Sequence, residues 1–170
     1  MRILKSSSFH FTLLLLVLAA VYWVHYAPSL PSKIPTHFDA HGSANEWSSP
    51  GRFARLYWEV MLGLFVVFTG SAFALQVLPR NLINLPHRDF WLSGELEAHT
   101  RLKLAENLLT FCSVTMIFFL LNFHQLVRAA IDESNRLTGE FNWFLGVYLC
   151  FVAIWTGSIL WRYSRIPRSR

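Results

Sequence analysis

Four long runs without a charged residue constrain this chain more than any other feature of its sequence. The runs lie between Lys5 and Lys33, Glu59 and Arg80, Glu106 and Arg128, and Glu140 and Arg162. Each provides about the 20 residues that a helix needs to cross a hydrocarbon core roughly 30 Å thick. Because a backbone in lipid must satisfy its own hydrogen bonds, we expect transmembrane helices near residues 9–27, 55–79, 104–128 and 141–163.

The composition agrees with this interpretation. Apolar residues make up 54% of the 170 residues and charged residues 15%, against about 25% charged in soluble domains. A transmembrane β-barrel would need alternating segments of about ten residues, and continuous runs such as 13–18 do not alternate. The first run has a basic start and a possible cleavage site at 17–19, as a signal peptide has, but its apolar stretch continues through Val24 and favours an uncleaved anchor. The fold class is therefore an all-α membrane protein with a single integral membrane domain over residues 1–170.

The basic residues predict the orientation. Ten flank one side of the predicted membrane, namely Arg2, Lys5, Arg80, Arg88, Arg101, Lys103, Arg162, Arg165, Arg168 and Arg170. Five flank the other side, namely Lys33, Arg52, Arg55, Arg128 and Arg136. Basic residues favour the cytoplasm, so we expect both termini and loop 80–103 there, and loops 28–53 and 129–140 outside a bacterial inner membrane. The net charge of +5 then needs no nucleic-acid partner, because the basic end can lie against anionic lipid heads of the bilayer.

Aromatic and small residues suggest how the helices are placed. Aromatic rings end most of the runs and predict interface belts that anchor the depth of each helix; they include Tyr22, Trp23, Tyr57, Trp143 and Trp161. Gly70 with Ala74, and Ala153 with Gly157, form small-xxx-small pairs that predict helix contacts. Cys112 and Cys150 lie inside spans and are interpreted as small apolar residues without a disulfide.

The loop between the first two spans, residues 28–53, is too patterned for a plain connector. Pro31 and Pro35 stiffen the exit from the membrane, and the segment 34–38 can be extended. Residues 39–42 have turn chemistry, with Gly able to adopt a positive φ, and Trp47 returns an aromatic ring to the interface. We predict an ordered extracytoplasmic hairpin over the helix ends, with His37 turned back toward them.

The loop at 80–103 has two halves. The first contains an apolar and aromatic stretch formed by Leu85, Pro86, Asp89, Phe90 and Trp91. The second is rich in helix formers, with Ser93 as a candidate N-cap, and is expected to continue into the third span. Glu97 and Arg101 are four residues apart and can pair on one helix face.

Both loops carry a resemblance to a known family. The motif Pro31-x-x-Ile34-Pro35-x-His37-Phe38-Asp39-x-x-Gly42, followed by Trp47, resembles the bacterial membrane family called domain of unknown function 1648. Family members usually have Asn at the position of Asp39. The stretch Leu85-Pro86-x-x-Asp89-Phe90-Trp91 is similar to a second segment of such proteins. The same domain forms the N-terminal part of SdpI-type proteins, which protect bacteria from a secreted toxin and relay its presence. The resemblance therefore implies an immunity or signalling role.

Three residues of the first motif could also bind a metal. His37, Asp39 and His41 alternate, and alternate residues of an extended strand share a face. Imidazole and carboxylate groups are transition-metal ligands, and a histidine in such a loop could instead sense protons. Against both, His37 can cap backbone groups of the hairpin and Asp39 can form its turn. We expect these structural roles, with no tightly bound metal and no cofactor.

Two classes of function remain. No acidic or basic residue lies in the middle of a predicted span, which argues against a stand-alone transporter, and no Walker loop or nucleophile elbow indicates an enzyme. The first class is a sensing or immunity-type protein that recognises a ligand through loop 28–53 and reports through loop 80–103. The second is an accessory or structural subunit, bound to a membrane protein partner, to another copy of the chain or within a larger transport or enzyme complex.

Overall fold

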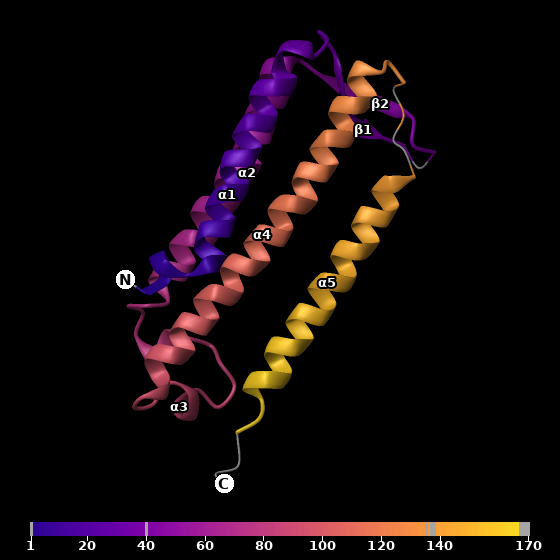
Figure 1. The fold of residues 1–170 in the computed structure, drawn as a ribbon. Helices are drawn as coiled ribbons and strands as arrows, with labels where there is room; N and C mark the ends of the chain where they lie inside the picture. The colour runs from indigo at the N-terminus through magenta and orange to yellow at the C-terminus, as the bar shows by residue number, and fades with distance from the viewer. Residues whose placement is uncertain (1, 40, 135, 137–138, 167–170) are drawn as a thin grey trace.

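The computed structural model describes residues 2–39, 41–134, 136 and 139–166, and within them four long helices dominate the chain. They are α1 (Ser7–Tyr26), α2 (Pro50–Ala74), α4 (Leu96–Ile131) and α5 (Glu140–Tyr163). All four are long and apolar enough to cross a membrane, so the predicted fold class is confirmed. The helices run roughly along one axis, and α1 begins at the same end of the bundle at which α5 ends (Figure 1).

All four helices differ from their predicted bounds, α1 and α5 by no more than two residues at either end and α2 and α4 by more. Helix α2 begins at Pro50 instead of 55, because Ser49 caps it by accepting a hydrogen bond from the Arg52 N–H, and it ends at Ala74 instead of 79. Helix α4 begins at Leu96, since the helix formers before the third apolar run extend it, as the sequence indicates. Ser93 is not its cap: the N-cap residue is Glu95, and the Ser93 hydroxyl donates to the Phe90 carbonyl at 2.8 Å.

Helix α4 is the centre of the bundle and contacts each of the other long helices. The main core lies between α1, α2 and α4 and contains Leu15, Met61 and Met116. Hydroxyl groups supplement this packing. The Thr12 Oγ1 lies 2.9 Å from Ser113 Oγ, and the Tyr57 hydroxyl donates to the Ala19 carbonyl at 2.7 Å. Interhelical hydrogen bonds of this kind hold helices together where lipid removes the hydrophobic driving force.

The aromatic residues divide into two groups. Trp143 and Trp161 are 75% and 60% exposed, as depth anchors should be. Tyr57 was expected in the same belt, and that expectation is wrong. Its side chain is fully buried, and its ring lies edge-on to Phe123 with centroids 4.9 Å apart. The hydroxyl bond to α1 explains why a tyrosine can occupy this core position.

The small-residue pairs do not make the helix contacts predicted from the sequence. Gly70, Ala153 and Gly157 are exposed, and a Cβ placed on Gly70 or Gly157 would meet no atom within 4 Å. Helix α5 packs against α4 through larger side chains instead. The Phe118 and Tyr148 rings stack at 4.3 Å, and the Tyr148 hydroxyl lies 3.0 Å from Thr115 Oγ1.

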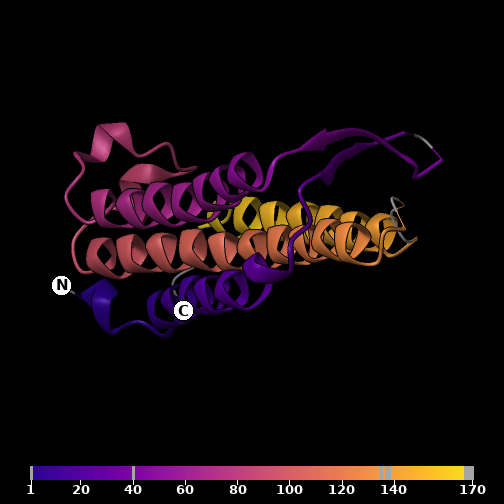
Figure 2. The same cartoon turned by 90° about the horizontal axis from the view of Figure 1, so that it is seen from above.

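A two-stranded antiparallel hairpin connects α1 to α2. Strand β1 (Ile34–Phe38) pairs with β2 (Ala44–Ser48), with irregular register around His37. Ile34 is fully buried and belongs to the main core, which fixes the base of the hairpin on the helices. In the view from above, the hairpin projects from the end of the bundle opposite the start of α1 (Figure 2).

The loop between α2 and α4 lies at the other end of the bundle. It contains two short helices, η3 (Arg80–Leu82) and α3 (Arg88–Trp91). The predicted pair between Glu97 and Arg101 is present, with Arg101 Nε 2.9 Å from Glu97 Oε1. Arg80 also pairs with Glu97.

Candidate functional site

The hairpin turn is built around Asp39. Its Oδ1 accepts hydrogen bonds from the backbone N–H groups of His41 at 2.8 Å and Ser43 at 2.9 Å. Its own N–H donates to the Ser43 carbonyl at 2.9 Å, and the Gly42 N–H donates to the Asp39 carbonyl. Gly42 has φ +76°, the positive value expected from the sequence. Asp39 therefore has the turn-forming role that its chemistry predicts.

The same bonds affect the charge state of Asp39. The N–H groups of Ser43 and then His41 stabilise the carboxylate and lower the pKa of this side chain below its usual value. The carboxylate is exposed to solvent. The lowered pKa keeps Asp39 ionised, as its role in the turn requires. A general acid would require a raised pKa instead.

His37 is hydrogen-bonded across the hairpin. Its Nδ1 lies 2.6 Å from Oδ1 of Asn45, on the opposite strand. The ring is exposed, and this bond goes to a side chain, whereas the sequence predicted that His37 caps backbone groups of the hairpin. Its partner is a side chain of β2 because the hairpin places the two residues close together. Within the described part of the chain, no three His, Cys, Asp or Glu side chains gather as metal ligands, and this applies to His37, Asp39 and His41.

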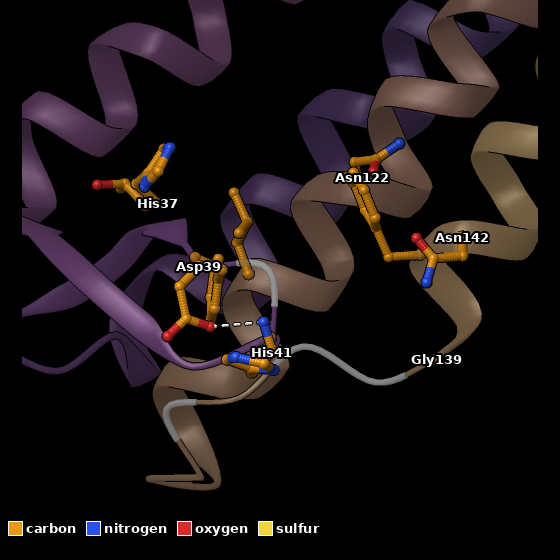
Figure 3. Close-up of a pocket in the computed structure, with 11 residues that line it drawn as sticks. His37, Asp39, His41, Asn122, Gly139 and Asn142 are labelled. Carbon is orange, nitrogen blue, oxygen red and sulfur yellow. Dashed lines mark hydrogen bonds between the residues drawn. The ribbon is translucent and has the colours of Figure 1, made fainter.

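A half-open cavity of about 680 Å³ lies between the hairpin and the facing ends of α4 and α5. Figure 3 shows the hairpin residues on one side and Asn122 and Asn142 on the helical side. The lining residues come from three separate parts of the chain, namely Thr36, His37, Phe38, Asp39, His41 and Gly42 of the hairpin, Asn122 and Leu126 of α4, and Gly139, Phe141 and Asn142 at the start of α5. The cavity therefore combines apolar and polar surfaces.

Asn122 is the most informative residue of the cavity. Its Nδ2 donates to the Phe118 carbonyl one turn earlier at 2.6 Å. Its Oδ1 is buried and has no hydrogen-bond partner among the described residues. A buried carbonyl oxygen without a partner costs about 1–3 kcal/mol. Asn122 therefore places a polar side chain with an unmet hydrogen bond in the wall of the cavity.

The position of the hairpin is fixed at two points. Pro35 and Ile34 are buried at its base. Near its tip, Ser43 forms an isolated backbone bridge with Arg136 of the α4–α5 connection. These contacts link the hairpin to the helices that form the other wall, so the cavity is formed before a ligand arrives.

The second motif lies at the opposite end of the molecule and does not contribute to this cavity. Trp91 Nε1 donates to the Tyr163 carbonyl at 3.0 Å, and the two rings meet edge-on at 5.3 Å. His87 Nε2 lies 3.1 Å from the Ser164 carbonyl. The loop therefore holds the end of α5, while Asp89 projects into solvent with its side chain 98% exposed.

Sequence reasoning missed the helical wall of the cavity. Asn122 and Leu126 are four residues apart and share a helix face. This four-residue spacing is enough to predict a shared face. It does not predict that the face lies opposite the hairpin, because that depends on the packing of α4 against α1 and α2.

The comparison with known proteins agrees with the first motif. Residues 14–54 match the family model described as domain of unknown function (DUF1648). The match covers most of α1, the whole hairpin and the start of α2, and it confirms the resemblance found in the sequence. No curated protein and no solved structure matches the chain significantly.

Proposed function

We propose that this protein recognises an extracytoplasmic ligand in the cavity between its hairpin and helices α4 and α5, as a sensing or immunity protein of the bacterial inner membrane. The observation that carries this proposal is the cavity itself, which has a volume of about 680 Å³, is already formed, and includes Asn122 in its wall, a residue whose buried Oδ1 has no partner among the described residues. A site fixed in advance loses less entropy on binding.

Two further features support the proposal. The DUF1648 segment, which resembles the N-terminal domain of SdpI-type immunity proteins, supplies the hairpin wall of the cavity. The excess of basic residues at the other end of the bundle favours a cytoplasmic position for that end. The hairpin would then face the outside, where a secreted toxin arrives.

The chemistry of the cavity favours binding over catalysis. The Asp39 carboxylate accepts two backbone hydrogen bonds within the turn, and the His37 ring is hydrogen-bonded to Asn45. Both groups are occupied in maintaining the hairpin. We therefore assign no catalytic role, no metal and no cofactor.

The test is protection of living cells. A strain without the protein and a complemented strain are exposed to spent medium from the parent strain, which contains its secreted toxins. The wild-type chain should protect. Asn122→Leu and Phe141→Ala, which alter the cavity wall, should lose protection at unchanged membrane levels. Val147→Ala is the matched control, because Val147 is 64% exposed on α5 and lies outside the cavity lining. Protection retained by both cavity variants, or absent from the wild type, would contradict the proposal.

An accessory-subunit function is the second candidate, and helix α5 favours it. No residue in the most apolar window of α5 is buried within the described structure. A helix that packs so little inside its own chain has a wide face available for a membrane partner. Purification in mild detergent would reveal a stable complex with a fixed stoichiometry if this function is the main one.

A further inference from the structure

A second cavity lies at the opposite end of the bundle, within the predicted membrane. Its volume is about 280 Å³, and it is bounded by the end of α2, loop 80–85, α4 and α5. Most of its lining is apolar and includes Leu75, Leu85, Leu104, Leu108, Trp155 and Ile159. Because these helices belong to the membrane spans, the cavity borders the hydrocarbon core of the leaflet at this end.

Basic side chains lie beside this cavity on the water side. Lys103 precedes Leu104 in α4, and Arg162 follows Ile159 by three residues, about one turn of α5. Lys103 is paired with Glu106 at 2.8 Å. Arg162 has no carboxylate partner in the described part of the chain and lies 6.0 Å from the centre of the Tyr163 ring. The rim therefore carries a net positive charge.

We propose that this cavity binds an anionic phospholipid of the adjacent leaflet. One acyl chain lies against the apolar lining, and the phosphate lies near Arg162 and Lys103. Apolar walls match the chain, and basic residues at headgroup depth attract a negative lipid surface. This inference does not depend on the outer cavity or on its ligand.

The proposal assigns a structural role to the second sequence motif, residues 85–91. Leu85 lines the cavity, and Trp91 binds the last turn of α5 through the Tyr163 carbonyl. Helix α5 otherwise contacts mainly α4. The motif loop therefore fixes the distance between α5 and the rest of the bundle, and with it the width of the lipid site.

The experiment uses the full chain in phosphatidylcholine nanodiscs with a small fraction of brominated lipid, which quenches nearby tryptophans. Brominated phosphatidylglycerol is compared with brominated phosphatidylcholine of the same chains. The signal of Trp155 is isolated by subtracting the Trp155→Phe variant, and that of exposed Trp143 by subtracting Trp143→Phe. We expect phosphatidylglycerol to be preferred about fivefold at Trp155, the order expected for one uncompensated basic residue near the surface, and hardly at all at Trp143.

Charge variants complete the test. Lys103→Gln combined with Arg162→Gln should reduce the preference at Trp155 to near one. Arg52→Gln combined with Arg55→Gln, at the hairpin end of α2, should leave it unchanged. Equal quenching by both lipids at Trp155 in the wild type would overturn the proposal. So would protection of Trp155 from both lipids, because no lipid would then reach the cavity.

Discussion

At the scale of single residues, Asp39 shows how one side chain can determine a loop. It accepts the His41 and Ser43 N–H groups, and these bonds lower the pKa of its carboxyl group. A lowered pKa in the folded state means that the stabilisation is present at neutral pH and is lost as pH falls through that value. That loss occurs below the ordinary Asp value of about 3.9.

Asp39→Asn is therefore expected to retain the turn at neutral pH, since an amide oxygen can accept the same two bonds, and asparagine is usual at this position in the DUF1648 family. The variant should also lose the acid dependence of the hairpin. The amide chemical shifts of His41 and Ser43, followed by NMR from neutral to acidic pH, measure both effects. Asp39→Ala should disturb the turn at every pH, and an acid transition that persists in Asp39→Asn would show that another group is responsible.

Arg101 is the residue whose importance the sequence understated. Its guanidinium donates to the Leu75 carbonyl at 2.6 Å and the Leu78 carbonyl at 2.8 Å, as well as to Glu97. Leu75 is the C-cap residue of α2, where carbonyl groups lack helical partners, and Leu78 lies in the segment that follows the helix. Arg101→Gln should lower the free energy of unfolding by about 1.5–3 kcal/mol, the range for hydrogen bonds to charged groups. Thermal unfolding in detergent measures it, with the more exposed Arg88→Gln as the control expected to change little.

At the scale of elements, the exposed glycine of α5 makes a clear prediction. Gly157 meets nothing within 4 Å of an added Cβ, so Gly157→Leu should leave the thermal stability of the isolated chain within about 0.5 kcal/mol. Ala72→Leu is the matched comparison, because Ala72 is fully buried in α2 and overpacking costs about 1–3 kcal/mol. Strong destabilisation by Gly157→Leu would show that this face packs against protein.

The elements also show what could be read from the sequence. Four spans follow from the spacing of charges, since a charge inside lipid is costly, and the turn follows from the chemistry of Asp39 and Gly42. The partner of each helix face does not follow. Tyr57 was assigned to an interface and is buried, whereas Gly70 and Gly157 were assigned to contacts and are exposed. In a chain that is apolar on nearly every face, hydrophobicity cannot distinguish a face toward lipid from one toward protein.

At the scale of the whole molecule, the fold separates two sites by the length of the bundle. The hairpin lies at one end of the bundle and the loop that contains α3 lies at the other (Figure 1). The larger cavity is beside the hairpin, and the apolar cavity is beside that loop. Helix α5 reaches both, since Phe141 lines the first cavity and Trp155 the second.

Reporter fusions after Arg170 should behave as cytoplasmic and fusions near Ser43 as exported; an exported C-terminus would reverse the proposed orientation.

The central claim is that the outer cavity receives a ligand. Site-specific photocrosslinking in living cells tests it most directly, with a photoreactive phenylalanine analogue at position 141 in the cavity or at position 147. Val147 is 64% exposed on α5 and outside the cavity lining. In spent medium from the parent strain, position 141 should give a light-dependent adduct that is absent at 147 and is lost when Asn122→Leu is added. No adduct at 141, or the same adduct at both positions, would contradict the claim.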